Sequence, residues 1–442
     1  MAKVALGSAR EIRANWSKNV EFAPTQVVHP RSEREIVHHI ARATAHGIGI
    51  RAMGAGHSFS PIAKPSGTTL TLDRYRGLAR IDHSTGEVTL RGGTRLWEIG
   101  PMLAKHSRAL EVMGDIDRQS IAGAVSTGTH GTGGRFTGVS GLVTGLKIVL
   151  ANGDAVWADR EHNVKLFEAA RLGLGALGII VEVRLRTVPL YKLHRREYSA
   201  PLEETAARFL ETSMEQDHQE FFFVPSGRRA VVRELNHVPA ESSNRGMGRV
   251  RTSIESEVVG NGALALANRL VQAVPATKRP LSSAVSALMP AGEAVHFPYR
   301  LFVASRRTRF RECEMAIPAS RFEEAFEALT RALEGKTRSL IFPLEVRRAA
   351  ADDVWLSTAH DRDTVYIAAH NPLHAASDDY LHLVHDTLVE FEGRPHWGKM
   401  HWLREAELRE LYPNFEQFVS VRNELDPDRL FSTPYLDSLL GG

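Results

Sequence analysis

Two glycine-rich stretches of the sequence each carry a histidine beside hydroxyl side chains. MGAGHSFSP covers residues 53–61 and contains His57; SIAGAVSTGTHGTG covers residues 120–133 and contains His130. Glycine permits positive φ and a close approach of the backbone, so consecutive N–H groups can turn inward and bind an anion. A tight turn would account for either loop alone. Two such loops in one region indicate a diphosphate held between them.

A third stretch, GLGALG at residues 173–178, matches the dinucleotide-binding pattern GxGxxG letter for letter. That pattern must follow a strand and open a helix, so that the pyrophosphate meets the helix N-terminus. Here it follows the helical pattern LFEAARL and leads into the strand pattern IIVEVRLRTV. We therefore exclude a nicotinamide-binding Rossmann domain, although these glycines still permit another ligand to approach the backbone.

Charged side chains in the second half of the chain suit acid–base chemistry. Glu345 and Arg347, in SLIFPLEVRRAA, are two apart on an expected strand, so both face the same way and Val346 faces the other. Taken alone, this spacing usually indicates a cross-strand ion pair. Lys399, in RPHWGK, taken alone is typical of a surface lysine after a turn.

Other kinds of site are not expected. The spacing of His370, His374, His382 and His385 matches no metal-ligand set, and these read as solvated histidines. Cys313 is the only cysteine, which excludes an internal disulfide and thiolate-rich zinc or iron–sulfur sites. The sequence has no nucleophile elbow, Walker A loop or HExxH motif, so no motif supports a hydrolase or phosphotransferase function.

The composition is that of a globular protein without a nucleic-acid partner. The 442 residues include 55 Lys and Arg against 52 Asp and Glu, with no long block of like charge. No segment offers the roughly 18 uncharged apolar residues of a membrane span, and the N-terminus lacks a signal-like apolar region. Residues 258–292 form a loose apolar stretch, interpreted as partly buried helices because basic residues interrupt it. We expect a cytoplasmic protein, with peripheral membrane association left open.

The elements that position the motifs follow from periodicity. Ser32 and Glu35 form a capping box before a helix that ends at Gly47. Strands are expected at 68–72, 78–82 and 87–93, a helix at 94–107, and a hairpin turning at Asn152-Gly153. Residues 1–190 thus form one α+β unit, and the pattern changes after Pro189. The length of the chain also favours two domains.

Taken together, the motifs resemble the vanillyl-alcohol oxidase, or PCMH-type, FAD-linked oxidoreductases. The chain is similar over nearly its full length to their aldonolactone oxidoreductase branch, which holds gulonolactone, galactonolactone and arabinonolactone oxidases and dehydrogenases, with alditol oxidase related. The resemblance rests on RAMGAGHSFSPIA at 51–63, GDIDRQSIAGAVSTGTHGTG at 114–133, LEVR at 344–347, RPHWGK at 394–399 and LDPDRLF at 425–431.

The resemblance implies a two-domain α+β fold. A PCMH-type FAD-binding domain would span residues 1–190, a substrate-binding cap domain residues 191–394, and a C-terminal segment, 395–442, would return to the flavin. In many members a histidine matching His57 is bonded to the 8α methyl of the flavin; the alternative is a histidine that only hydrogen-bonds nearby. His130 would contact the flavin or support its loop. The cofactor-binding residues so implied are Gly54, Ala55, Gly56, His57, Ser58, Gly114, Ser120, Gly123, Ala124, Thr127, Thr129, His130, Gly131, Gly178, Ile179, His396 and Lys399.

The resemblance also changes the interpretation of the charged pair. It implies Glu345, Arg347 and Lys399 as catalytic and substrate-binding residues, with His370 as a further substrate contact. Arg347 would polarise the reacting hydroxyl, Glu345 would orient it or accept its proton, and Lys399 would stabilise the reduced flavin.

The function so implied is oxidation of a sugar-1,4-lactone at a carbinol carbon, with hydride transfer to FAD. Ala124 stands where alditol oxidase has a serine, which favours lactones over open-chain alditols. The alternatives are an alditol or other carbohydrate oxidase and, from another class, a non-catalytic flavin-binding protein. The electron acceptor, O2 or a cytochrome- or quinone-type molecule, and the oligomeric state stay open.

Overall fold

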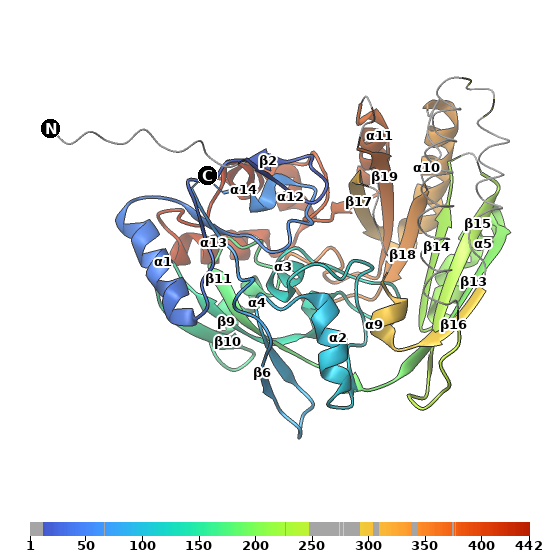
Figure 1. The fold of residues 1–442 in the computed structure, drawn as a ribbon. Helices are drawn as coiled ribbons and strands as arrows, with labels where there is room; N and C mark the ends of the chain where they lie inside the picture. Colours follow the sequence, from blue (N-terminus) through green and yellow to red (C-terminus); the bar gives the residue numbers. More distant parts are fainter. Residues whose placement is uncertain are drawn as a thin grey trace.

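The computed structural model describes residues 12–65, 67–225, 227–246, 274, 277, 292–303, 309–336, 343–373, 375 and 377–442. Figure 1 shows two parts side by side, one combining the N-terminal and C-terminal segments and the other built on a long sheet. The expected α+β class is confirmed. The domain boundaries at residues 190 and 394 stay predictions.

Helix α1 (Glu33–Ala45) and a small parallel sheet open the first part. Ser32 caps α1 by accepting a hydrogen bond from the backbone N–H of Glu35, and the helix buries Ile36, Ile40 and Ala43. The sheet has the order β3-β5-β4, with β3 at Gln26–Val28, β4 at Ile50–Ala52 and β5 at Thr68–Leu70. The first glycine loop begins where β4 ends.

A five-stranded antiparallel sheet with the order β10-β9-β11-β7-β6 packs against these elements. Its strands are β6 (Leu78–Ile81), β7 (Val88–Arg91), β9 (Val143–Val149), β10 (Ala155–Asp159) and β11 (Ile179–Leu185). Helices α2 (Leu96–Ala104), α3 (Ile121–Ser126) and α4 (Val164–Ala170) share one hydrophobic core with it. The predicted strands, the second helix and the hairpin at Asn152-Gly153 are confirmed.

The second part is an eight-stranded sheet in which every neighbouring pair is antiparallel. Its order is β16 (Gly292–His296), β13 (Lys192–Pro201), β15 (Arg229–Val238), β14 (His218–Phe223), β18 (Leu344–Ala349), β19 (Thr364–Pro372), β17 (Phe310–Pro318) and β20 (Arg394–Pro395). One face packs an apolar core with α5 (Leu202–Glu215), α10 (Phe322–Lys336) and α11 (Asp379–Val389). Because side chains alternate along a strand, the other face is free to carry polar groups toward the first part.

The C-terminal segment returns to the first part, as Figure 1 shows by the red helices beside the blue elements. Helices α12 (Glu405–Leu411), α13 (Phe415–Leu425) and α14 (Pro434–Leu440) share the core of α2 to α4. The fully buried Trp397 donates from Nε1 to the carbonyl of Leu356, 2.8 Å away. This return brings the RPHWGK motif to the junction between the two parts.

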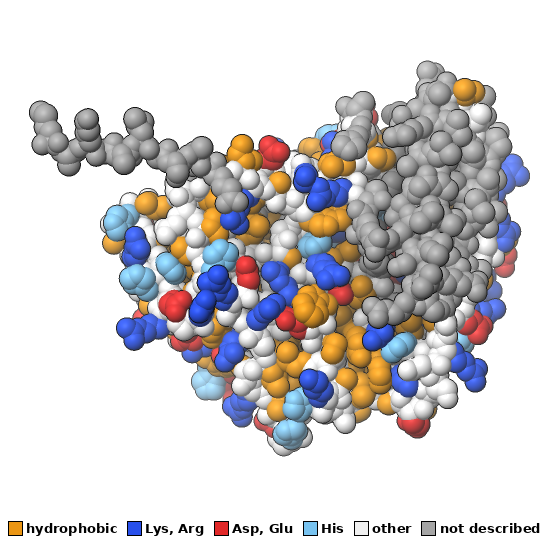
Figure 2. Space-filling model, viewed as in Figure 1, with side chains coloured by type: hydrophobic (Ala, Val, Ile, Leu, Met, Phe, Trp, Pro, Cys, Tyr) orange, Lys and Arg blue, Asp and Glu red, His pale blue; other side chains and the backbone are white. Residues whose placement is uncertain are grey.

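Surface features agree with the near balance of charge. Lys and Arg side chains are spread over the face in Figure 2, with Asp and Glu side chains between them. Among the described residues, no helix is both long enough and apolar enough to cross a membrane. The apolar stretch 258–292 lies almost wholly outside the described residues.

Candidate active site

A cleft of about 870 Å³, open solvent included, lies where the glycine loops meet. Its walls come from the loop after β4, the start of α3 and the loop between α4 and β11. The predicted cofactor-binding residues that line it are Gly54, Ala55, Gly56, His57, Ser58, Ser120, Gly123, Thr127 and Gly178. GLGALG follows helix α4 and precedes strand β11, which confirms the order that excludes a Rossmann motif.

The first glycine loop is built to receive an acceptor-rich ligand. Within the part of the chain that the structure describes, no hydrogen-bond acceptor is found for the backbone N–H groups of residues 54–58. Gly56 has a φ of +69°, and a Cβ added at Gly54 would lie 2.5 Å from Oγ of Ser120. Backbone N–H groups left without partners beside a cleft suit the oxygens of a diphosphate.

A second cavity, of about 620 Å³, continues the cleft into the junction with the eight-stranded sheet. The two spaces share His57, Ser58, Gln119 and Thr127 in their walls. Besides the shared His57, Ser58 and Thr127, the predicted residues that line the second cavity are Gly114, Thr129, His130, Arg347, His396 and Lys399. A long ligand in the cleft can therefore reach a chamber whose far wall carries charged side chains.

His57 stands where the two spaces meet. Its imidazole stacks on the indole of Trp16, with ring centroids 5.4 Å apart. Burial, followed by the positive charge of Lys399, lowers the pKa of His57 to about 4. His57 is therefore neutral at physiological pH, with a ring nitrogen free of a proton.

Arg347 belongs to a row of alternating charges across the eight-stranded sheet. Strand register places Glu197, Arg233, Glu220 and Arg347 side by side on β13, β15, β14 and β18. Nε of Arg347 donates to Glu220 over 3.0 Å, and its Nη2 contacts Glu345 and, at 3.4 Å, Asp115. Burial alone would lower the pKa of Arg347, but these carboxylates raise it well above its usual value. The guanidinium is therefore held charged and in a fixed orientation.

Lys399 faces two carboxylates of β17. Its Nζ lies 2.6 Å from Oε2 of Glu312 and 4.0 Å from Oε2 of Glu314. Both carboxylates line the cavity, yet neither was predicted from the sequence. The available signal was the alternation FRECEM, which puts two acids on one face of a strand and Cys313 in the apolar core on the other.

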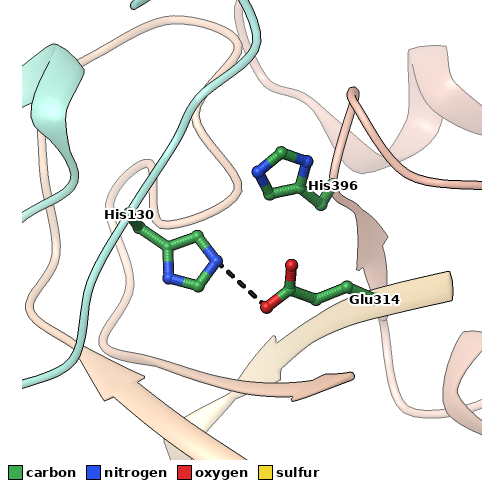
Figure 3. A group of neighbouring side chains, drawn as sticks. All are labelled: His130, Glu314 and His396. Atoms are coloured by element: carbon green, nitrogen blue, oxygen red, sulfur yellow. Dashed lines mark ion pairs between the residues drawn. The ribbon is translucent and has the colours of Figure 1, made fainter. Parts of the chain in front are cut away.

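His130, Glu314 and His396 form a buried cluster, shown in Figure 3. Nε2 of His130 lies 3.1 Å from Oε1 of Glu314, and Nδ1 of His130 contacts the carbonyl of Gly131. Burial alone would raise the pKa of Glu314, but His130 and Lys399 hold it well below its usual value. Figure 3 shows the Glu314 carboxylate and the two imidazoles pointing toward one another.

The same cluster has the composition of a metal site, since its potential ligand atoms lie within 4.8 Å of one another. Two contacts oppose metal binding. Nδ1 of His396 accepts a hydrogen bond from the backbone N–H of Gly398, so the one proton of this neutral ring is on Nε2. The Lys399 ammonium already supplies a positive charge to Glu314. The cluster is therefore better suited to holding protons than a metal ion.

Several predicted residues lie behind the walls rather than in them. Ala124 and Ile179 are core side chains, and Gly131 packs against the backbone of Met113. Glu345 lies behind Arg347, and His370 lies behind Glu312, with its Nε2 3.5 Å from Oε1 of that carboxylate. Of the four histidines interpreted as solvated, His370 and His385 are in fact buried, and His374 is outside the described residues.

Sequence comparison decides the family. Residues 183–439 match the family model described as D-arabinono-1,4-lactone oxidase. The chain belongs to the D-arabinono-1,4-lactone oxidase family. Residues 24–159 match a second model, described as an FAD binding domain, so this member of the D-arabinono-1,4-lactone oxidase family binds FAD.

Named relatives cover nearly the whole chain. The L-gulono-1,4-lactone dehydrogenase of Mycobacterium tuberculosis is 37% identical over 430 residues, 97% of this chain and 99% of the relative. The L-gulonolactone oxidase of Bos taurus is 26% identical over 96% of this chain and 97% of the relative. The alditol oxidase of a Streptomyces species is 28% identical over 97% and 99%, respectively.

A solved structure confirms the fold expected for the D-arabinono-1,4-lactone oxidase family. Cholesterol oxidase from B. sterolicum superposes with a TM-score of 0.81, covering 98% of this chain and 97% of the other, at 16% sequence identity. At that identity the likeness concerns the fold alone.

Proposed function

We propose that this protein oxidises an aldono-1,4-lactone at a ring carbon that bears a hydroxyl, giving a 2-keto lactone that tautomerises to an ascorbate-like product. The observation that carries the proposal is the cavity in which Arg347 and Lys399 line a chamber continuous with the glycine-loop cleft. The lactone-specific names of the relatives at 37% and 26% identity support the substrate class.

The cleft is the proposed FAD site. The N–H groups of residues 54–58 would bind its diphosphate, and Ser120, Gly123 and Gly178 line the neighbouring wall. When bound, FAD supplies a two-electron acceptor for the hydride of the substrate carbon. Ala124 and Ile179 are buried beside wall residues Gly123 and Gly178.

His57 is the proposed point of covalent attachment to the flavin. Its neutral imidazole is the protonation state that can act as a nucleophile, and stacking on Trp16 fixes the ring plane. Its place between the two spaces puts it beside any ligand that passes from one to the other.

On the substrate side, Arg347 would donate hydrogen bonds to the oxygen of the reacting hydroxyl and hold it in a fixed position. Glu345, which lies behind Arg347, orients the guanidinium together with Glu220 and Asp115. Lys399, in the wall of the second cavity, would supply positive charge to the reduced cofactor. His370 acts through Glu312 rather than by touching substrate.

A panel of substrates and electron acceptors tests the proposal. Purified protein is assayed with L-gulono-, L-galactono- and D-arabinono-1,4-lactone and with open-chain alditols, using O2, cytochrome c and a quinone analogue as acceptors. We expect lactones to give the highest kcat/KM. A preference for alditols would change the assigned substrate class from lactones to open-chain alditols. Bound FAD that no lactone, sugar or alditol reduces would contradict an enzymatic function.

A further inference from the structure

The ammonium group of Lys399 is held by the side chains of two residues on one strand. Oε2 of Glu312 lies 2.6 Å from Nζ, and Oε2 of Glu314 lies 4.0 Å from it. The side chains of Glu312 and Glu314 are 7% and 3% exposed, so water cannot replace either carboxylate without rearrangement of the wall. Because the two residues are two apart on β17, both reach the same face of the sheet.

The backbone of the same two residues holds the turn that carries Lys399. The carbonyl of Glu314 accepts from the N–H of His396 over 3.0 Å, and the carbonyl of Glu312 accepts from the N–H of Met400 over 2.9 Å. Lys399 closes the turn by donating its N–H to the carbonyl of His396. The position of Lys399 and the direction of its side chain are therefore both set by β17.

Each carboxylate is itself oriented by an imidazole. Oε1 of Glu314 lies 3.1 Å from Nε2 of His130, and Oε1 of Glu312 lies 3.5 Å from Nε2 of His370. In both residues one oxygen therefore faces Lys399 and the other faces a histidine. The resulting chain, His370–Glu312–Lys399–Glu314–His130, crosses the wall of the cavity.

The charges around Lys399 have opposing effects. Burial alone would lower the pKa of Lys399, but Glu312, Glu314 and Asp115 raise it. The other titratable or charged groups nearby are His57, His396 and Arg347 in the cavity walls and Cys313 behind β17. The two carboxylates of β17 are the first two groups that oppose the effect of burial on the pKa of Lys399, ahead of Asp115.

We propose that Glu312 and Glu314 are positioning residues that hold Lys399 in place and keep its ammonium charged during turnover. The inference rests on the proposed function of Lys399 at the reduced cofactor. A neutral or displaced amine would supply no charge there, so the two glutamates set the pH range over which the site works.

The first test measures the rate of flavin reduction against pH in wild type, Glu312→Gln and Glu314→Gln. Rapid anaerobic mixing is used because lactones hydrolyse in alkali. Wild type should keep its rate up to alkaline pH. Glu312→Gln should lose about tenfold for each pH unit above the lowered pKa of Lys399, and Glu314→Gln, whose carboxylate is farther away, should lose less. Glutamine keeps the shape of each side chain, so a merely structural role predicts a lower Tm with no change in pH profile.

A second readout does not depend on activity. Only a neutral amine reacts with acetic anhydride, so the acetylation of Lys399 in the holoenzyme, followed by peptide mass spectrometry, reports its charge. We expect faster labelling in Glu312→Gln. The matched control is Glu33→Gln, which removes a carboxylate 2.6 Å from Lys147 and should change labelling of Lys147 only.

The outcomes separate this inference from the function on which it rests. Unchanged pH profiles and unchanged labelling of Lys399 in both glutamine variants would overturn the inference, even if Lys399→Met is slow. A Lys399→Met variant that reduces flavin at the wild-type rate would instead remove the role of Lys399 itself. If one glutamine variant fails to fold, the other and its labelling still decide.

Discussion

Lys399 is the residue whose replacement best separates chemistry from cofactor binding. It lines the second cavity but not the glycine-loop cleft. Lys399→Met should slow flavin reduction by roughly 10²-fold, the range typical for loss of one preorganised charge, and leave FAD content unchanged. Stopped-flow absorbance checks the rate, with Lys147→Met as a control far from the cavity. Equal reduction rates in wild type and Lys399→Met would contradict the assignment.

His57 makes a prediction that needs no substrate. In the wild type we expect flavin to stay with the pellet after acid precipitation, because a neutral imidazole at the junction of the two spaces is available for bond formation. In His57→Ala the colour should move to the supernatant. If the flavin of the wild type is released to the supernatant, the covalent bond to His57 is excluded, while binding of FAD is not.

At the residue scale, local motifs pointed to the residues of one half of the candidate site and not to those of the other half. His57 lies within the first glycine loop, so this part of the candidate site could be predicted from the sequence without knowledge of the fold. The roles of Glu312 and Glu314 depend on the turn at 396–400 lying beside β17, a contact across more than 80 residues of chain. The ion pair of Glu345 with Arg347 was predictable from spacing, but not that Glu345 lies behind the wall.

At the element scale, the loop after β4 makes the next prediction. A methyl group at Gly54 would lie 2.5 Å from Oγ of Ser120, which caps α3 by accepting from the N–H of Gly123. Gly54→Ala should therefore displace the loop and reduce the FAD retained on purification severalfold. Removing the obstructing oxygen in Gly54→Ala/Ser120→Ala should restore part of it, although loss of the cap costs about 1 kcal/mol.

The matched control for this pair is Gly292→Ala, because an added Cβ at Gly292 meets no atom of the described residues within 4 Å. Full FAD content in Gly54→Ala would show that the loop tolerates a side chain and is not the proposed diphosphate-binding loop.

Most elements of the first part were predictable, since caps, turns and alternation are local signals. The order of the eight-stranded sheet was not, because neighbours such as β14 and β18 are far apart in the chain.

At the scale of the whole molecule, the loop between β18 and β19 connects the two parts. It contains two adjacent aspartates whose contributions to stability depend on pH in opposite directions. Burial raises the pKa of Asp352 from 3.8 to about 6. A carboxyl that binds its proton more tightly in the folded state lowers the free energy of unfolding as pH rises from about 4 to about 6. For Asp352 the decrease is about 3 kcal/mol. Asp352→Asn should therefore raise Tm at pH 7.5 by a few degrees and much less at pH 4.5.

Asp353 is the matched opposite. Burial alone would raise its pKa, but Arg171, 2.6 Å away, and Arg160 lower it to about 2, so its stabilising effect is present above pH 4 and lost in acid. Asp353→Asn should lower Tm at pH 7.5 because it leaves the buried Arg171 guanidinium with fewer partners. Thermal unfolding of both variants at two pH values checks the pair; a shift of the same sign in both would contradict it.

In the proposed function, electrons pass from a lactone to FAD in the cavity between the two parts. The most direct measurement is the visible absorbance of the flavin under strict anaerobiosis, before and after addition of L-gulono-, L-galactono- or D-arabinono-1,4-lactone. We predict bleaching to the reduced spectrum by at least one lactone, and recovery of the colour when an acceptor is admitted. A flavin spectrum that no lactone changes, in protein with full FAD content, would contradict the account.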